Sequence, residues 1–456
     1  MTRLTFVLAP GQNHFFVELA EALCDELRRL DVEAEHVTGG FPPLEPDRAY
    51  ALIPPHEYFV LEGHRTPPSP EQLRRTIFIT AEQPETIHFH QNVALADRAG
   101  ALFDINARAV RAYRRQGVRA NHLQLGYTPS WDHFDAAGPA DDLIFMGAWT
   151  SRRGRVIAEA AGELAQLRGR YVFSDNSRPN TVASPGFLTG ADKWEALTRS
   201  RLLLNVHQGD EPYFEWHRAL QAIHCGTTVL TESSSDAEPL VAGRHYAAAD
   251  AAGLGGAALE LARDPAAAAA LAAEAYEYIN ADLPLSRAAA ALAETVAGVL
   301  AGGGGSAAGR GLLAASAARA RLWLKRSVPS RGPERPPMPD LEGSVPEMDA
   351  TDHFVWIPDP GGEPLSTARA DLAAALEADA AASFSYGLVA DASRGILNPL
   401  PWVSNRVPAP PVMVRADAMR TAVSGGEGEL AVVLDRLVSD PDAKGVNIQR
   451  IVARRT

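Results

Sequence analysis

Short apolar runs alternate with amphipathic segments along the first 300 residues of the chain. Each run is about four to eight residues long and rich in Val, Ile, Leu and Phe, a pattern typical of strands buried on both faces. The runs predict strands at 4–9, 32–38, 50–54, 76–80, 101–106 and 121–127, and then at 142–147, 170–175, 202–207, 227–232 and 245–250.

The segments between these runs carry apolar residues at helical spacing. Phe16, Leu19, Leu23 and Leu27 recur at steps of three or four, so they share one helix face. Buried strands that alternate with such helices predict parallel sheets covered on both sides. We therefore expect an α/β chain with two doubly wound, Rossmann-like domains facing a cleft, with ligands at the carboxyl ends of the strands.

Changes in composition divide the chain into four parts. A polar connector with Gly and Pro separates the two groups of strands near residue 138, and "AGGGGSAAG" follows the second group. The expected parts are a first Rossmann-like domain (1–138), a second Rossmann-like domain (139–300), a linker with a basic helix (301–348), and a small C-terminal α/β module (349–456).

Composition and charge narrow the class of protein. The chain has 456 residues, of which 46% are hydrophobic, and 56 acidic against 43 basic residues give a net charge of −13. This charge argues against a general nucleic-acid binder. Two cysteines provide neither a disulfide framework nor a metal-site spacing, and we expect no metal. No long apolar stretch predicts a transmembrane helix or signal peptide, so we expect a cytoplasmic protein.

The basic segment 311–326 leaves two readings open. Its Leu and Trp residues and its positive charge suit a helix lying on an anionic membrane surface, which would make the protein peripheral to the membrane. Its abundant Ala and few large apolar residues favour a helix that packs on the first domain instead. The oligomeric state is left open.

Two side chains at the ends of first-domain strands are candidates for catalysis. His14 follows the first strand and Asn13, the expected N-cap of the next helix. Imidazole titrates near neutrality, so His14 can act as a general base on an acceptor hydroxyl. Glu82 follows the fourth strand and can accept from a hydroxyl or orient a base. The structural alternatives are a packed helix-start histidine and a carboxylate that caps the next helix.

The second domain presents polar side chains at corresponding positions. Arg152 and Arg153 begin the helix after the strand at 142–147, and guanidinium groups at a helix N-terminus suit a diphosphate. Arg218 and Gln221 lie three apart on a helix predicted from 213 to 225, and so share a face. Gly226 suits the C′ position that ends this helix. The other candidate ligand-binding residues are Asn205, His207, Gly226, Glu232, Ser233, Ser234, Asp236 and Glu238. Carboxylates hold vicinal diols, and the hydroxyls with a following helix start can hold phosphate; an ordinary Ser-rich cap is the alternative.

The ordered segments "DLIFMGAWTSRRGRVI", "LLLNVHQ", "FEWHRALQAIHCGTTVLTE" and "DAEPLVAGRHY" resemble group 1 glycosyltransferases of the GT-B fold, of the spore-maturation or CgeB-like type. The resemblance covers residues 1 to about 295. It implies transfer of a sugar from a nucleoside diphosphate to a hydroxyl acceptor, without a metal or other cofactor. It also implies that the domain 1–138 is on the acceptor side and that the domain 139–300 binds the nucleotide sugar. It also implies that Arg218, Gly226 and Glu238 belong to the donor site, where Gln221 stands in place of a frequent Glu.

The C-terminal module is similar, more weakly, to the latter half of a family 2 GT-A glycosyltransferase. The positions that match its Asp-x-Asp are Asp359, Pro360 and Gly361, so one carboxylate is missing. A remnant with a binding or assembly role is the expectation. For the whole chain, the alternatives to a glycosyltransferase are a non-catalytic GT-B scaffold or carbohydrate-binding protein, and a nucleotide-sugar epimerase.

Overall fold

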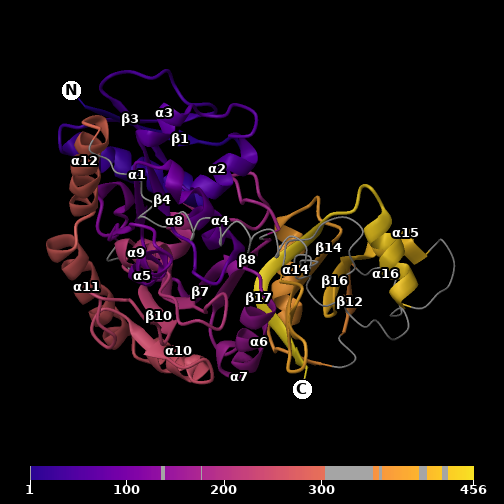
Figure 1. Cartoon of the computed structure of the whole chain (residues 1–456). Helices are drawn as coiled ribbons and strands as arrows, with labels where there is room; N and C mark the ends of the chain where they lie inside the picture. The colour runs from indigo at the N-terminus through magenta and orange to yellow at the C-terminus, as the bar shows by residue number, and fades with distance from the viewer. Residues whose placement is uncertain are drawn as a thin grey trace.

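The first six strands of the computed structural model form one parallel sheet, in the order β2-β1-β3-β4-β5-β6 (Figure 1). The structure describes residues 2–134, 139–175, 177–302, 353–358, 362–399, 408–423 and 430–455. The strands are β1 (Arg3–Leu8), β2 (Glu33–Thr38), β3 (Arg48–Leu52), β4 (Thr76–Thr80), β5 (Ala101–Asp104) and β6 (Asn121–His122).

Helices cover both faces of this first sheet. The helices and short 3-10 turns are α1 (His14–Arg29), α2 (Pro55–Leu61), α3 (Pro70–Arg74), α4 (Ile87–Leu95), η1 (Ala96–Arg98), α5 (Ala107–Arg115) and η2 (Pro129–Trp131). Alternate strand residues face opposite sides, so Phe6 packs into the core shared with α1 while Val7 packs against α2, α4 and α5. Asn13 caps α1 by accepting from Phe15 N, as its sequence position predicts.

A second parallel sheet has the order β11-β10-β9-β7-β8. Its strands are β7 (Asp141–Ala148), β8 (Gly169–Ser174), β9 (Ser200–Asn205), β10 (Thr228–Glu232) and β11 (Ala247–Ala249). Its helices are α6 (Ser151–Glu159), α7 (Ala161–Leu164), α8 (Gly190–Thr198), α9 (Trp216–His224), α10 (Leu254–Arg263), α11 (Pro265–Asp282) and α12 (Ser286–Leu300). The predicted pair of doubly wound α/β units is confirmed.

Two segments that run side by side join the two sheets. Tyr127 N donates to Leu283 O at 2.8 Å, and Leu285 N donates to Tyr127 O at 2.7 Å. Beyond this crossing, α12 returns to the first sheet and packs against α1, β3 and β4. The carboxyl ends of the two sets of strands therefore face one another across a crossing made of two chain segments.

The third sheet is mixed and shares a core with the second. Its order is β12-β16-β14-β17-β13, with β15 paired to β14. The elements are β12 (Phe354–Ile357), β13 (Glu363–Pro364), α14 (Ala368–Ala378), β14 (Phe384–Asp391), β15 (Gly395–Leu397), β16 (Val412–Arg415), α15 (Ala416–Val423), α16 (Leu430–Ser439) and β17 (Gly445–Arg455). The basic segment 311–326 and the Asp359–Gly361 stretch lie outside the described residues.

His224, at the end of α9, is held in its neutral form beside the crossing. Its Nε2 accepts from Thr128 N at 3.1 Å, so its Nδ1 carries the proton and donates to Leu220 O at 2.7 Å. Burial lowers the pKa of His224 to about 4. A second proton would have to sit on Nε2, where it would face the Thr128 N–H.

We expect the free energy of unfolding to fall as the pH is lowered from about 6.5 to 4. The folded pKa lies below the unfolded one, so the unfolded chain binds the extra proton in this window and stability is lost with falling pH. The His224 contribution reaches about 3 kcal/mol at most, from roughly 1.4 kcal/mol per pKa unit. Urea unfolding at pH 7 and pH 4.5 measures it; an unchanged pH slope in His224→Gln would contradict it.

Candidate functional site

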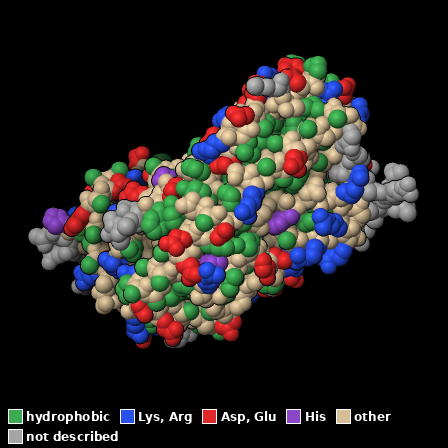
Figure 2. Space-filling view, turned by 90° about the vertical axis from the view of Figure 1, so that its left-hand side faces the viewer, with side chains coloured by type: hydrophobic (Ala, Val, Ile, Leu, Met, Phe, Trp, Pro, Cys, Tyr) green, Lys and Arg blue, Asp and Glu red, His purple; other side chains and the backbone are tan. Residues whose placement is uncertain are grey.

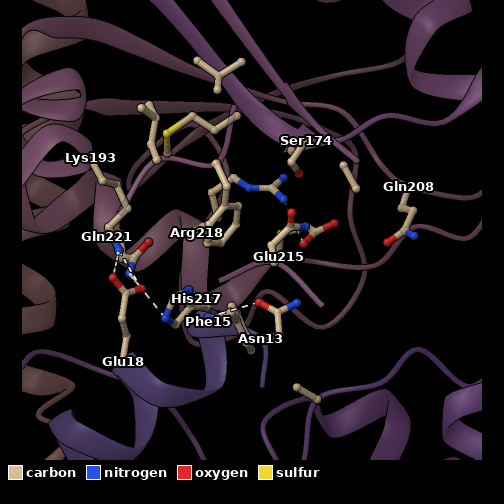
Figure 3. Close-up of a pocket in the computed structure, with 18 of the residues that line it drawn as sticks. Asn13, Phe15, Glu18, Ser174, Lys193, Gln208, Glu215, His217, Arg218 and Gln221 are labelled. Carbon is tan, nitrogen blue, oxygen red and sulfur yellow. Dashed lines mark hydrogen bonds and ion pairs between the residues drawn. The ribbon is translucent and has the colours of Figure 1, made fainter. Parts of the chain in front are cut away.

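A cavity of about 250 Å³ lies between the two parallel sheets, at the carboxyl ends of their strands. Each sheet reverses its strand order there: β1 lies between β2 and β3, and β7 lies between β8 and β9. Such reversals open a crevice in which α/β sheets bind ligands. Asn13 follows β1, Gly147 lies at the end of β7, Arg153 follows β7 and Gln208 follows β9, and all four line the cavity. Asn13 and Gln208 are labelled in Figure 3.

A cationic cluster occupies the second-domain wall of this cavity. Arg153 on α6 is 1% exposed and donates through Nε to Val206 O at 2.9 Å and through Nη1 to Ala148 O at 3.0 Å. Arg218 on α9 donates to Asn205 Oδ1 at 2.8 Å. Both arginines also lie beside Glu215, at 3.1 Å and 3.7 Å. Two guanidinium groups thus converge on one carboxylate, which leaves the cluster with a net positive charge.

The pKa values of the cluster reflect this crowding. Burial, followed by repulsion from Arg218, lowers the pKa of Arg153 to about 10. Burial acts to raise the pKa of Glu215, but Arg218 and Arg153 outweigh it, so its pKa is lowered and the carboxylate stays charged. An anionic ligand at this wall would therefore relieve repulsion between like charges.

Gly147 at the end of β7 makes room for both guanidinium groups. A Cβ at this position would lie 3.1 Å from Arg153 Nη1 and 3.4 Å from Arg218 Nη2. A larger residue would therefore displace the arginines or fill the space between them. The glycine is thus explained by close approach rather than by backbone conformation.

A second cluster forms the opposite end of the cavity and joins the two domains (Figure 3). Lys193 Nζ on α8 contacts both oxygens of Glu18 on α1, at 2.5 and 2.6 Å. Gln221 Nε2 lies 3.3 Å from Glu18 Oε2 and 3.3 Å from His217 Nε2. Donors and acceptors alternate over a few ångströms, which suits hydroxyl groups rather than a second phosphate.

His217 is a neutral, packed member of this cluster. Burial, with further repulsion from Lys193 and Arg218, holds its pKa well below the usual range. Its ring lies 4.1 Å from the Phe15 ring, measured between centroids, so it links α9 to α1. His217 is four residues before Gln221 on α9, and both face the cavity.

The structure brings only some of the sequence candidates to the cavity wall. Arg153, Arg218 and Gln221 line it. Asn205 lies directly behind Arg218, as its hydrogen-bond acceptor. Gly226 has φ +71° just past the C-cap of α9, in agreement with the predicted glycine stop, and does not line the cavity.

Arg152 and Glu232 form an ion pair with each other. The carboxylate accepts from both terminal nitrogens of the guanidinium at 2.6 and 2.8 Å, and it also accepts from His207 N at 2.6 Å. The pKa of Glu232 is lowered, because these hydrogen bonds outweigh the effect of burial. His207 Nε2 lies 2.9 Å from Ser234 Oγ. This network braces the loops after β9 and β10 and leaves no free charge of either sign on the pair.

The Ser-rich loop corrects a sequence expectation. No helix begins between Glu232 and β11, so this stretch offers no helix N-terminus to a phosphate. Ser233 and Ser234 donate to backbone carbonyls of Ala249 and Glu232. Several hydroxyl residues followed by acidic residues therefore indicate a loop whose side chains hydrogen-bond to nearby backbone carbonyls.

The last acidic residues of the loop face away from the cavity wall. Asp236 forms an ion pair at 2.6 Å with Arg111 of the first domain, and Glu238 is exposed. Neither is among the cavity-lining residues. Asp236 therefore contributes to contact between the two domains.

The two catalytic candidates have different neighbours. His14 Nε2 is 3.6 Å from Glu18 Oε1, which lines the cavity, and His14 N donates to Asn180 O at 2.7 Å. Glu82 lies 3.8 Å from His56 Nε2, behind Ala81 of the cavity wall. Thr86, and not Glu82, caps the following helix α4. Burial raises the pKa of Glu82 and lowers that of His56 to about 3.

Sequence reasoning missed most of the cavity-lining polar residues. Glu215 and His217 come just before Arg218 and carry a local signal, since they lie at the start of α9. Glu18 and Lys193 are 175 positions apart and carry none. The other missed polar residues of the wall are Ser174, Asn180, Gln208 and Tyr213.

A family model described as "Glycosyl transferase-like" matches residues 152–294, which include both arginines of the cationic cluster. No curated protein sequence matches the chain. Among solved structures, HepE from Anabaena in complex with UDP-glucose is 13% identical, with a TM-score of 0.45; the match covers 65% of this chain and all of that one.

Two further solved structures are similar to the same extent. Sucrose-phosphate synthase from Thermosynechococcus elongatus is 14% identical, with a TM-score of 0.46, and covers 66% of this chain and 100% of its own. WaaG, a glycosyltransferase involved in lipopolysaccharide biosynthesis, is 13% identical, with a TM-score of 0.42, over 65% of this chain and 100% of its own.

The described residues also bear on membranes and metals. None of their helices is long and apolar enough to span a bilayer. Within the same residues, no cluster of three or more His, Cys, Asp or Glu side chains is arranged to hold a metal ion. Figure 2 shows acidic and basic side chains interspersed over one face of the molecule.

Proposed function

We propose that the protein transfers a sugar from a nucleoside diphosphate to a hydroxyl acceptor. The observation that carries this proposal is the convergence of Arg153 and Arg218 in the cavity at the ends of β7 and β9. The matched glycosyl transferase-like segment contains both residues. We also propose, on the resemblance in the sequence, that the protein is of the CgeB-like type.

The cationic cluster would serve the leaving group. As the bond between the anomeric carbon and the phosphate oxygen breaks, its bonding electron pair stays on that oxygen and adds negative charge to the diphosphate. Two fixed guanidinium groups stabilise that charge without reorganisation. We propose that they supply the positive charge needed for departure.

The other end of the cavity would hold the sugar and the acceptor. Glu18, Lys193 and Gln221 offer alternating donors and acceptors to hydroxyl groups. The acceptor oxygen forms the new bond to the anomeric carbon, and its proton leaves to a base. We propose His14 as that base, because its imidazole lies beside Glu18, with Glu82 as the alternative.

A nucleotide sugar that stabilises the folded protein is identified as the candidate donor. Ligand at about 100 times its Kd adds roughly 2.7 kcal/mol to the free energy of unfolding, which a thermal shift assay detects. Turnover is then measured as free nucleoside diphosphate. Release only in the presence of an acceptor supports transfer. Binding without any release would favour a carbohydrate-binding scaffold, and sugar isomerisation would favour an epimerase.

Arg218→Ala is expected to weaken nucleoside diphosphate binding about 10- to 100-fold and to leave the fold intact. A hydrogen bond to a charged group contributes roughly 1.5–3 kcal/mol, and Arg153 still neutralises Glu215 in the variant. Calorimetric titration measures the affinity. Arg244→Ala, which removes an exposed ion pair with Glu274, is the matched control. Equal affinities in the two variants would remove Arg218 from the site.

A further inference from the structure

The hairpin of β14 and β15 is pressed against α6, the helix that carries Arg152 and Arg153. Gly395 has φ +85°, and a Cβ there would lie 3.0 Å from Gly154 C and 3.1 Å from Arg155 N. From the other side, a Cβ on Gly154 would lie 3.4 Å from Ile396 N. Two glycines thus let the backbone of the hairpin contact the backbone of the helix. Figure 1 shows this part of the C-terminal module against α6 and β8.

The contact continues into a common hydrophobic core. Ile396, Leu388 and Ile451 of the module belong to one buried cluster with Trp149 and Ile157 of the second domain. Ile396 is 1% exposed. At the edge of this core, Arg170 Nε of β8 donates to Gln449 Oε1 of β17 at 3.0 Å. The module is therefore packed like a layer of the second domain, and its position relative to α6 is determined by close packing.

The tip of the hairpin is itself rigid. Asp391 Oδ1 accepts from Ser393 N, Ser393 Oγ and Arg394 N at 2.9, 2.7 and 2.8 Å. These bonds lower the pKa of Asp391 against the effect of burial, so the carboxylate stays ionised. Ala392 N donates to Arg455 O at 3.1 Å and ties the tip to β17. The surface that meets α6 is thus held from both sides.

Other faces of the same turn of α6 carry Arg153 of the cationic cluster and Arg152 of its brace. Arg152 and Arg153 lie in the first turn, where one binds Glu232 and the other reaches the cavity. Gly154, which meets the hairpin, is the next residue. Because one turn of a helix moves as a unit, a displacement at Gly154 moves the guanidinium of Arg153 relative to Arg218.

We propose that the C-terminal module is a positioning element of the anion-binding end of the cavity, and that Gly395 is the residue through which it sets the place of α6. This inference rests on the proposed donor site. It predicts that the module is required for tight binding of the diphosphate, although none of its described residues lines the cavity.

The test compares two glycine variants of the full chain. Gly395→Ala introduces both backbone strain at φ +85° and a clash with α6. Gly243→Ala introduces similar strain at φ +77° but meets no atom within 4 Å, so it is the matched control. The readouts are hydrogen exchange of the α6 amides and calorimetric affinity for UDP, GDP, ADP and CDP.

We expect Gly395→Ala alone to speed exchange in α6 and to weaken nucleotide binding about tenfold, the lower bound for one charge-assisted hydrogen bond. Equal behaviour of the two variants would overturn the inference, and so would faster α6 exchange with unchanged affinity. If no nucleotide of the panel binds the wild-type chain, the proposed function fails on its own. In that case, hydrogen exchange of the α6 amides still tests whether the C-terminal module holds α6 in place.

A second pair of variants covers the case in which Gly395→Ala does not fold. Gly154→Leu places a good helix former on α6, where it meets the hairpin, and Gly256→Leu places one on α10, where a Cβ meets nothing within 4 Å. Loss of nucleotide affinity only in Gly154→Leu supports positioning through the module. Equal affinities in this pair would contradict it.

Discussion

Lys193→Met is expected to lower the free energy of unfolding by about 3–5 kcal/mol, the usual effect of removing one partner from a buried ion pair. The side chain of Lys193 is 5% exposed and that of Glu18 is 12% exposed. In the variant, Glu18 keeps only Gln221 at 3.3 Å and His14 at 3.6 Å, and neither replaces the lost charge. Most of the effect would come from the carboxylate left unpaired.

A double variant separates that unpaired charge from the rest. Glu18→Gln combined with Lys193→Met removes both charges and should recover much of the stability lost in the single variant. Urea unfolding of the four proteins in this cycle measures the coupling. Lys444→Met, which breaks an exposed pair with Asp379, serves as the control and should change little. A single variant as stable as the wild type would show that the pair contributes nothing.

The same pair joins α1 to α8 across the two parallel-sheet domains, so its loss should also loosen the contact between the domains at the cavity. Two other ion pairs cross between the domains at more exposed places. Arg108, which also pairs with Glu85, pairs with Glu211, and Arg111 pairs with Asp236. Exposed pairs are weakened by salt, whereas the buried one is screened much less. We therefore attribute most of the electrostatic coupling between the domains to Glu18 and Lys193.

His14→Ala is expected to lower the turnover rate by about 10²- to 10⁴-fold, the usual contribution of a general base. The affinity for the nucleotide should not change, because His14 is on the first domain and the cationic cluster is on the second. Steady-state release of nucleoside diphosphate and calorimetry measure the two quantities separately.

The control for this variant is His64→Ala, which removes an exposed histidine of the same domain. Near-normal turnover in His14→Ala would return His14 to a packing role. Glu82→Gln is then the decisive variant, since a loss of turnover there would move the base to the pair formed by Glu82 and His56.

Much of the fold could be predicted from local patterns. The strands at 76–80 and 101–106 appear as β4 (Thr76–Thr80) and β5 (Ala101–Asp104), and the run at 121–127 is a strand only at Asn121–His122. The rest of that run belongs to the crossing of the two connecting segments, where Gly126 and Tyr127 meet Leu283 and Pro284. A run of apolar residues predicts only that the segment is buried. It does not distinguish a segment buried at the crossing from a strand buried in a sheet.

The candidate site was predicted less completely, and Arg152 and Arg153 show why. Both were expected at a diphosphate, but only Arg153 reaches the cavity, while Arg152 is paired with Glu232, which lies 80 residues away in the sequence. Neighbouring positions on a helix point about 100° apart, so adjacent residues face different surroundings. The sequence places a positive charge at the start of α6 but does not say what neutralises it.

By itself, the sequence determined the parallel sheets, the capping of α1 by Asn13, the glycine stop of α9, and the side of the sheets on which the cavity lies. These features depend on the spacing of apolar residues and on local backbone geometry, both of which act over a few residues. Only the tertiary structure decided which charges remain available at the cavity, that Glu18 and Lys193 meet there, and that the C-terminal module packs on α6. These depend on contacts between distant segments, where the energy of a charge or a close approach is determined by its partner.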